Sequence, residues 1–347
     1  MTENPLHLDG LEFIEFTGPN VERLETFCAR HGLARVARHR SEDMQLWRQN
    51  DINFVINNAP GSYSTSFRAL HGPSACAMGF RVRDAEKAFA TAVERGARPF
   101  LGDARAKGGW SMPAIYGIGD ALVYFVDRYG DRGNVYDAGF EYEGAERVPK
   151  GNGLLVIDHM TNNVPAGEMQ KWCDFYTDVF GFQERRYFDI KGKTTGLFSK
   201  VMRSPCGKFS IPINEPQDPK SQIQEYLDEY KGSGIQHIAF LTDDIMGSVA
   251  QLRRQGVDFL APPPNSYYEK VSTRVPLVRE PIKKLQELAV LADGDEHGYL
   301  LQIFTKNQVG PVFIEIIQRR KHEGFGDGNF QALFDAMEED QRVRGVI

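Results

Sequence analysis

An internal repeat constrains the fold of this chain more than any other feature of its sequence. The stretch 10–39, GLEFIEFTGPNVERLETFCARHGLARVARH, resembles 154–188, which begins LLVIDHMTNN, and a second pair of similar stretches covers 75–100 and 234–260. Each stretch has the pattern of an apolar strand, a polar turn and an amphipathic helix that ends near a glycine. Four strand–helix units in two pairs predict an α+β fold built from two similar domains.

The same patterns predict the domain boundaries. The charged, glycine-containing segment 142–153 has the composition of a linker. We therefore expect one domain over 1–145 and a second over 154–347. Within the second domain, 265–293 predicts a loop with short helices, and 328–347 predicts a final amphipathic helix.

Acidic residues and glycines mark the expected ends of two helices. Asp84, Asp243 and Asp244 precede the helical patterns, where N-cap and first-turn positions favour aspartate. Gly96 and Gly256 follow them, where helix C-termini favour glycine. The two units of the second pair are therefore expected to begin and end their helices in the same way.

Composition excludes several functional classes. The formal net charge is −6 and no basic run occurs, so the electrostatic signature of a nucleic-acid-binding protein is absent. The N-terminus lacks a signal-peptide pattern, and no apolar stretch approaches the roughly 20 residues of a membrane helix. The four cysteines are scattered without metal-site spacing, as expected for reduced thiols. We expect a cytoplasmic protein with neither a nucleic-acid nor a membrane partner.

Three ionisable residues interrupt apolar strands of the second half. His159 lies in LLVIDHM, His237 in GIQHIAF and Glu315 in PVFIEIIQ. Burying such groups costs free energy unless their polar atoms are satisfied, and a shared cation would satisfy all three at once. Two histidines and one carboxylate on different strands also suit the facial triad of non-haem Fe(II) oxygenases. The sequence therefore predicts a metal site in the second domain.

The first half serves as an internal control for this prediction. In our alignment of the repeats, Phe16, Ala77 and Tyr124 take the places of the three ionisable residues. A lone strand histidine is more often a hydrogen-bonded core residue, and a lone buried glutamate is more often paired with a base. If strand geometry alone demanded polar groups there, both halves would carry them, so the difference favours a metal. The remaining histidines, including His31 and His71, fall in turns, loops or helix ends, where we expect them to be solvated.

An ordered series of long motifs indicates a family. The motifs are IDHMTNN (157–163), IPINEP (211–216), SQIQEYLDEYKGSGIQHIAFLTDDI (221–245), YLLQIFTK (299–306), VFIEIIQRR (312–320) and GFGDGNFQALF (324–334). With them, and over essentially its whole length, the chain resembles the 4-hydroxyphenylpyruvate dioxygenase family of the vicinal oxygen chelate superfamily. The resemblance implies two domains, each of paired βαβββ modules forming a partly open barrel of the glyoxalase and bleomycin-resistance type, with a C-terminal lid helix.

The resemblance also implies an activity. In this family only the C-terminal cup holds Fe(II), and its metal motifs fall on His159, His237 and Glu315. The family reaction converts 4-hydroxyphenylpyruvate and O₂ to homogentisate and CO₂, in the catabolism of tyrosine and phenylalanine. No separate 2-oxoglutarate is needed, because the 2-oxo acid is part of the substrate. The family forms homo-oligomers, so we expect an oligomer, with a tetramer favoured and a dimer as the alternative.

Further motif residues match the substrate pocket of the family. The resemblance assigns substrate binding to Ser199, Pro212, Asn214, Gln222, Gln302, Phe304, Phe313, Phe325, Asn329 and Phe330, and catalytic roles to Gln236, Asn214 and Phe330. Strand alternation puts Pro212 and Asn214 on one face. In a regular strand, Gln236 would lie on the face opposite to His237. The glycines of GFGDGNF would let the terminal helix move as a lid.

Three alternatives remain open from the residues. Hydroxymandelate synthases share the fold, the substrate and the metal but oxidise the benzylic carbon, and they tend to differ where this chain has Pro212, Asn214 and Phe330. A non-catalytic binding protein of the same fold is a second alternative, against which the intact triad argues. An extradiol ring-cleaving dioxygenase is a third, but no additional histidine lies near His159 or His237 in the sequence.

Overall fold

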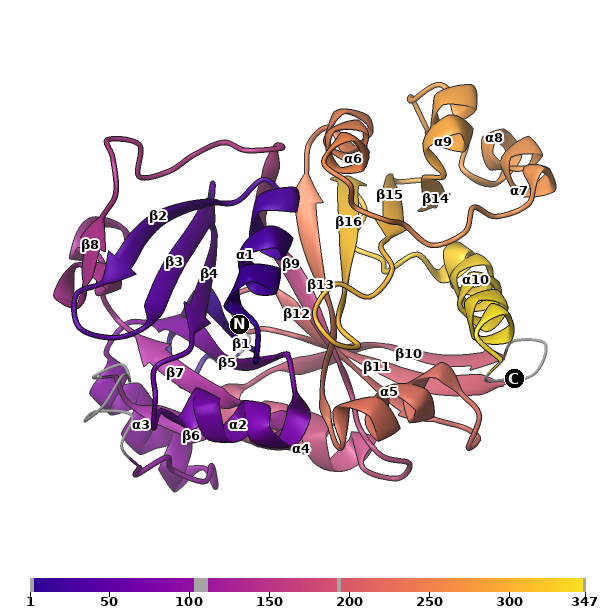
Figure 1. Cartoon of the computed structure of the whole chain (residues 1–347). Helices are drawn as coiled ribbons and strands as arrows, with labels where there is room; N and C mark the ends of the chain where they lie inside the picture. Colours follow the sequence, from indigo (N-terminus) through magenta and orange to yellow (C-terminus); the bar gives the residue numbers. More distant parts are fainter. Residues whose placement is uncertain (1–2, 103–111, 192–194, 346–347) are drawn as a thin grey trace.

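Two eight-stranded mixed sheets form the framework of the protein (Figure 1). The computed structural model describes residues 3–102, 112–191 and 195–345. The strand order is β6-β7-β5-β1-β4-β3-β2-β8 in the first sheet and β10-β11-β12-β9-β13-β16-β15-β14 in the second. Apart from one extra edge strand in each sheet, the second order repeats the first in reverse. The expected repeat and the vicinal oxygen chelate fold class are thus confirmed.

The elements have the following bounds. The strands of the first sheet are β1 Leu8–Thr17, β2 Ala34–His39, β3 Met44–Gln49, β4 Ile52–Asn57, β5 Ser74–Val82, β6 Ala114–Tyr116, β7 Leu122–Val126 and β8 Phe140–Tyr142. Those of the second sheet are β9 Leu154–Asn163, β10 Gln183–Lys191, β11 Gly196–Arg203, β12 Ser210–Pro216, β13 Gly234–Thr242, β14 Leu291–Gly294, β15 Tyr299–Phe304 and β16 Phe313–Arg320. The helices are α1 Val21–Arg30, α2 Tyr63–His71, α3 Ala85–Glu94, α4 Met169–Phe180, α5 Gln222–Tyr230, α6 Ile245–Arg254, α7 Asn265–Glu269, α8 Val271–Arg274, α9 Ile282–Leu288 and α10 Phe330–Val343.

The ladder registers correct one part of the repeat alignment. In the second sheet Ala239 pairs with both His159 and Glu315, and in the first sheet Gly79 pairs with both Phe13 and Tyr124. The counterpart of His159 is therefore Phe13, and the expected Phe16 was wrong. An offset of three residues reverses the strand face, because side chains alternate with a period of two.

The concave side of the first sheet is filled with apolar side chains. Phe13, Ala77 and Tyr124, the counterparts of the three ionisable residues, belong to one buried cluster there. The rings of Phe13 and Tyr124 lie 6.0 Å apart. A larger core spans both halves, and within it the rings of Phe54 and Phe240 are 5.8 Å apart. The first sheet thus supplies packing where the second sheet carries ionisable groups.

Helix ends agree with the sequence patterns at four of the five marked positions. Asp84 and Asp244 are N-caps of α3 and α6, and their carboxylates accept hydrogen bonds from backbone N–H groups three residues on. Asp243 is not a cap. Gly96 and Gly256 follow these helices with φ of 99° and 82°, a left-handed conformation that favours glycine.

Two histidines expected in solvent are buried instead. The Nδ1 of His31 lies 2.8 Å from the carbonyl of Phe27, one turn earlier in the chain. The Nδ1 of His71 lies 2.7 Å from the carbonyl of Tyr230, and so joins α2 to α5. A histidine at a helix end can satisfy a nearby carbonyl oxygen and be buried, which sequence position alone does not show.

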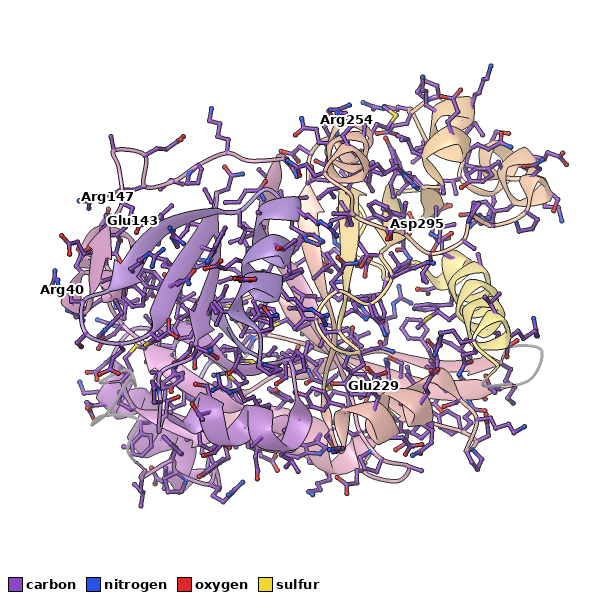
Figure 2. The ribbon with its side chains drawn as sticks, in the orientation of Figure 1. Arg40, Glu143, Arg147, Glu229, Arg254 and Asp295 are labelled. Atoms are coloured by element: carbon purple, nitrogen blue, oxygen red, sulfur yellow. The ribbon has the colours of Figure 1, made fainter. Side chains whose placement is uncertain are left out.

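The periphery carries the expected charged side chains. Figure 2 shows Arg40 and Arg254 at the margin of the molecule, and both residues, like Glu229, are exposed. Segment 265–293 forms the short helices α7, α8 and α9, as predicted, and also the start of strand β14, which was not predicted. Within the part of the chain that the structure describes, no helix is long and apolar enough to cross a membrane.

Candidate metal centre

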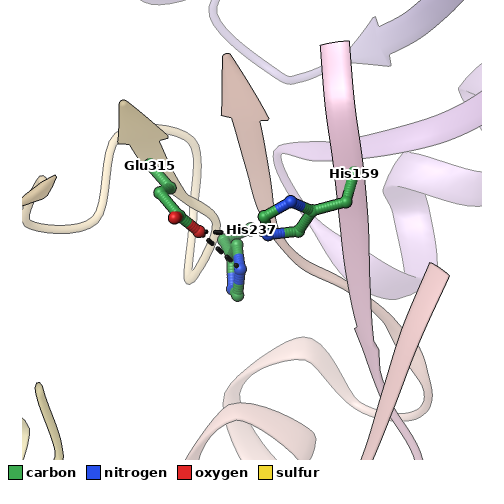
Figure 3. Close-up of side chains that lie close together, drawn as sticks. All are labelled: His159, His237 and Glu315. Atoms are coloured by element: carbon green, nitrogen blue, oxygen red, sulfur yellow. Dashed lines mark ion pairs between the residues drawn. The ribbon is translucent and has the colours of Figure 1, made fainter. Parts of the chain in front are cut away.

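Three neighbouring strands bring the ionisable residues together. His159 lies on β9, His237 on β13 and Glu315 on β16, and β13 pairs with both of the other strands. One nitrogen of each histidine and one carboxylate oxygen of Glu315 all lie within 4.8 Å of one another (Figure 3). The Nε2 of His159 is 3.0 Å from Glu315 Oε2, and that of His237 is 3.5 Å from the same oxygen. Three buried donors of these types therefore converge on one point.

The second nitrogen of each histidine is held by a neighbouring side chain. His159 Nδ1 lies 2.7 Å from Asp158 Oδ2, and His237 Nδ1 lies 3.0 Å from Gln236 Oε1. When Nδ1 of a neutral imidazole carries the proton and donates it to an oxygen, the lone pair of the ring lies on Nε2. Both Nε2 atoms face Glu315, so the donor set fits a divalent metal with two histidines and one carboxylate.

A β-bulge explains how Gln236 and its neighbour His237 both reach the site. The β9–β13 register shifts between Ile235 and His237, which leaves Gln236 as an extra residue. This corrects the regular-strand expectation that would send Gln236 to the other face. The first sheet has the same shift opposite Cys76. A bulge can re-aim a side chain toward a site, and here it supplies the partner of His237.

Burial and charge set the ionisation of the group. Burial opposes a charged imidazole, but the Glu315 carboxylate and the hydrogen bond to Asp158 outweigh it and raise the pKa of His159 to about 9. Burial likewise opposes a charged carboxylate, yet the His159 charge lowers the pKa of Glu315 to about 2. Burial lowers the pKa of His237. Without a metal, the site is therefore an ion pair between His159 and Glu315 beside a neutral His237.

Metal binding is expected to depend on pH in a defined direction. Because a metal needs the neutral form of His159, binding at pH 7 should release about one proton, and affinity should rise about tenfold per pH unit until pH 9. Calorimetry of Co²⁺ binding in buffers of different ionisation enthalpy measures this release. A binding enthalpy that does not vary with the buffer would contradict the expected ion pair.

A cavity opens in front of the three donors. The predicted site residues that line it are His159, His237, Glu315, Ser199, Pro212, Asn214, Gln222, Gln236, Phe304, Phe313, Phe325 and Phe330. The structure therefore gathers most of the predicted residues around one cavity.

Two predicted residues do not line this cavity. Gln302 is fully buried, and its amide atoms have no hydrogen-bond partner among the described residues. Asn329 is also fully buried, and its Oδ1 accepts a hydrogen bond from the Tyr267 hydroxyl. Gln302 packs instead against the turn at Gly326, where an added Cβ would lie 2.4 Å from its side-chain oxygen.

Several lining residues had not been predicted. They are Thr161, Phe188, Ile190, Leu197, Val201 and Met337. The period of two along each strand could have indicated Thr161, two residues after His159, as well as Leu197 and Val201 on either side of Ser199. Phe188 and Ile190 follow the same period of two, and they are the two residues of β10 that are not exposed.

The cavity combines aromatic walls with a small amide cluster. Phe313 stacks on His237 with ring centroids 4.8 Å apart, and Phe325 meets His159 edge to face at 5.2 Å. Opposite them, Asn214 Nδ2 lies 3.2 Å from Asn163 Oδ1 and 3.5 Å from Gln236 Oε1. Aromatic faces suit a planar ring and amides suit its polar substituents, so the space fits an aromatic ligand that carries a metal-chelating group.

Helix α10 covers one side of this cavity. Figure 1 shows it between the β10–β11 hairpin and the α7–α9 region, and its residues Phe330 and Met337 line the space. Glu338 accepts hydrogen bonds from the backbone N–H and the hydroxyl of Thr195, at 2.9 and 3.1 Å. Gln341 donates to Glu225 of α5 at 2.9 Å. Polar contacts on two sides thus hold the helix closed.

Loss of one of these contacts should impair closure. Glu338→Ala leaves the buried Thr195 N–H without its acceptor, which costs roughly 1–3 kcal/mol. We expect turnover per active site to fall about tenfold, since an incompletely closed lid admits water. Steady-state O₂ consumption measures it, with exposed Glu229→Ala on α5 as the control. Equal rates for the two variants would show that Glu338 does not hold the lid.

Profiles of known protein families match both halves of the chain. Residues 2–141 match the family profile described as "Hydroxyphenylpyruvate dioxygenase, HPPD, N-terminal". Residues 156–303 match the profile of the "Glyoxalase/Bleomycin resistance protein/Dioxygenase superfamily". The first range runs from β1 into β8 of the first sheet, and the second runs from β9 into β15 but ends before β16.

The similarity to individual relatives extends over nearly the whole chain. A curated Pseudomonas aeruginosa protein named 4-hydroxyphenylpyruvate dioxygenase is 50% identical over 350 residues, covering 99% of this chain and 97% of the relative. A solved xylose isomerase-like TIM barrel/4-hydroxyphenylpyruvate dioxygenase fusion protein superposes with a TM-score of 0.83 at 33% identity, over 97% of this chain and 54% of that one. A mutant 4-hydroxymandelate synthase from Streptomyces coelicolor gives a TM-score of 0.82 at 26% identity, over 96% and 99%. A sequence identity of 50% to the Pseudomonas aeruginosa protein, along nearly the full length of both chains, shows that this chain belongs to the 4-hydroxyphenylpyruvate dioxygenase family.

Proposed function

We propose that this protein is a 4-hydroxyphenylpyruvate dioxygenase that converts 4-hydroxyphenylpyruvate and O₂ to homogentisate and CO₂. Family membership supports the activity. The observation that carries the proposal is the convergence of His159, His237 and Glu315 at one end of an aromatic cavity. The 2-oxo acid of the substrate would lie at the donor end, and its phenol would lie between the aromatic walls.

His159, His237 and Glu315 would hold Fe(II), which leaves coordination positions open and supplies the activation of O₂ and of the chelating 2-oxo acid. Asp158 and Gln236 orient the two imidazoles through Nδ1. The substrate itself provides the 2-oxo acid, so no separate 2-oxoglutarate is required.

The remaining residues of the cavity bind and enclose the substrate. Phe304, Phe313, Phe325 and Phe330 hold the aromatic ring, while Ser199, Asn214 and Gln222 offer hydrogen bonds to its hydroxyl and carboxylate groups. Pro212 shapes the same wall. Asn214, Gln236 and Phe330 take the catalytic positioning roles, and α10 excludes water. Gln302 and Asn329, both fully buried, would support the turn that begins at Gly326 and leads into α10.

We also propose a division of roles along the chain. Residues 154–347 form the catalytic domain, and residues 1–145 form a domain for packing and assembly, because its counterparts of the ligands are Phe13, Ala77 and Tyr124. By analogy with the family, the protein is a cytoplasmic homo-oligomer, with a tetramer favoured over a dimer. Sedimentation velocity of the purified protein tests the assembly.

Oxygen consumption tests the proposed activity against a binding-only role. Protein reconstituted with Fe(II) should consume O₂ only when 4-hydroxyphenylpyruvate is added, and protein treated with a chelator should not. Tight iron and substrate binding without O₂ uptake would favour a binding protein. The hydroxymandelate synthase alternative, which the structural similarity of that enzyme keeps relevant, differs in its product.

A further inference from the structure

The side chain of Arg319 contacts Asp158, the hydrogen-bond partner of the proposed metal ligand His159, and also the loop that precedes helix α10. On one side, Arg319 Nε and Nη2 donate to the two carboxylate oxygens of Asp158, each at 2.7 Å. Asp158 Oδ2 in turn lies 2.7 Å from His159 Nδ1. A continuous chain of charge-assisted hydrogen bonds therefore runs from the guanidinium to the imidazole.

On the other side, Arg319 holds the 322–325 loop. Its Nη1 donates to the carbonyl oxygens of His322, at 3.2 Å, and of Gly324. Its guanidinium lies over the Phe325 ring, 5.3 Å from the centroid, and that ring meets His159 edge to face. The position of Phe325 against the ligand thus depends on the same side chain that binds Asp158.

The first sheet provides a comparison for this pair. Glu12 stands at the position equivalent to Asp158, and it pairs with Arg81 at 2.6 Å. The Glu12 and Arg81 side chains are 7% and 17% exposed, against 11% for Asp158 and 17% for Arg319. A buried acid–arginine pair therefore belongs to both halves of the fold, but the residue after Glu12 is Phe13, which offers no imidazole.

We propose that Asp158 and Arg319 are positioning residues for the metal ligand His159. Asp158 fixes the ring so that Nε2 points to the metal, and Arg319 fixes Asp158 together with the loop that presses Phe325 onto the ring. The Arg319 guanidinium therefore fixes both the orientation of the His159 ring and the position of Phe325 in the cavity wall. This inference rests on the proposed metal site.

Co²⁺ titration, followed by the visible absorption of the bound ion, tests the role of Asp158. Asp158→Asn keeps the shape of the side chain but removes its charge, and the affinity for Co²⁺ should fall about 10–100-fold. Glu12→Gln is the matched control, since it weakens an equally buried pair far from the ligands. Both variants should lose thermal stability, and only Asp158→Asn should lose affinity and change the shape of the Co²⁺ spectrum.

Variants of Arg319 test the second half of the inference. Arg319→Met should lower Co²⁺ affinity and raise the KM for substrate, because both Asp158 and the loop lose their anchor. Arg319→Lys, which keeps the charge, should restore part of both. Circular dichroism identifies folded variants, and Asp158→Asn keeps the inference testable if Arg319→Met does not fold.

The outcomes separate two failures. If the wild-type protein binds no Co²⁺, the proposed metal site itself is wrong. If the wild type binds and Asp158→Asn binds equally well, or loses no more affinity than Glu12→Gln, the metal site stands and the positioning role is overturned.

Discussion

Replacing Glu315 by glutamine is expected to lower substrate-dependent O₂ consumption on the order of a thousandfold, because the proposed metal would lose the carboxylate among its three ligands. The substitution keeps the size of the side chain, so cavity formation cannot account for the loss. It also removes the partner that holds the pKa of His159 near 9. The metal content of purified protein, measured by atomic absorption, should fall in parallel with the rate.

Tyr124→Phe is the matched control for this prediction, since Tyr124 occupies the equivalent position in the first sheet. Its rate should stay within about twofold of wild type, because hydroxyl loss there costs only on the order of 1 kcal/mol of stability. A Glu315→Gln protein that retains its metal and a rate within tenfold of wild type would exclude Glu315 as a ligand.

Replacing Gly326 by alanine is expected to destabilise the start of the lid. Gly326 has a φ of 84°, and an added Cβ would lie 2.4 Å from the side-chain oxygen of buried Gln302. The left-handed backbone costs an L-residue about 1–2 kcal/mol, and the overlap with packed atoms adds roughly 1–3 kcal/mol. Since Phe325 and Phe330 flank this turn, kcat/KM should fall about a hundredfold.

Gly345→Ala separates the two contributions to this effect. Gly345 has a φ of 75°, and among the described residues no atom lies within 4 Å of the point where an added Cβ would stand, so only the backbone cost applies. Urea unfolding and steady-state kinetics of both variants measure the difference. If Gly326→Ala and Gly345→Ala lost the same stability, the Gln302 side chain would have moved to make room for the added methyl group, and the turn would not be tightly packed.

Much of the candidate metal site could be predicted from the sequence because ionisable side chains are rare inside apolar strands. His159, His237 and Glu315 stood out for that reason, and the repeat offered a half without them for comparison. The period of two along strands also placed Asn214 and Pro212 on one face, and both line the cavity.

The errors arose where local geometry departs from regular patterns. Phe13 and Phe16 are both apolar and aromatic, so composition did not distinguish them, and only the strand register did. The bulge at Gln236 has no sequence signal in this chain, yet it decides which way that amide points. Gln302 and Asn329 do not line the cavity, and the turn at Gly326 packs against Gln302, a tertiary contact that motif spacing does not reveal.

The most direct test of the account is identification of the product. Protein reconstituted with Fe(II) is incubated with 4-hydroxyphenylpyruvate, O₂ uptake is recorded with an electrode, and the products are separated by chromatography. The account predicts homogentisate and CO₂, each formed in an amount equal to the O₂ consumed. Formation of 4-hydroxymandelate, or the absence of O₂ uptake by folded, iron-loaded protein, would contradict it.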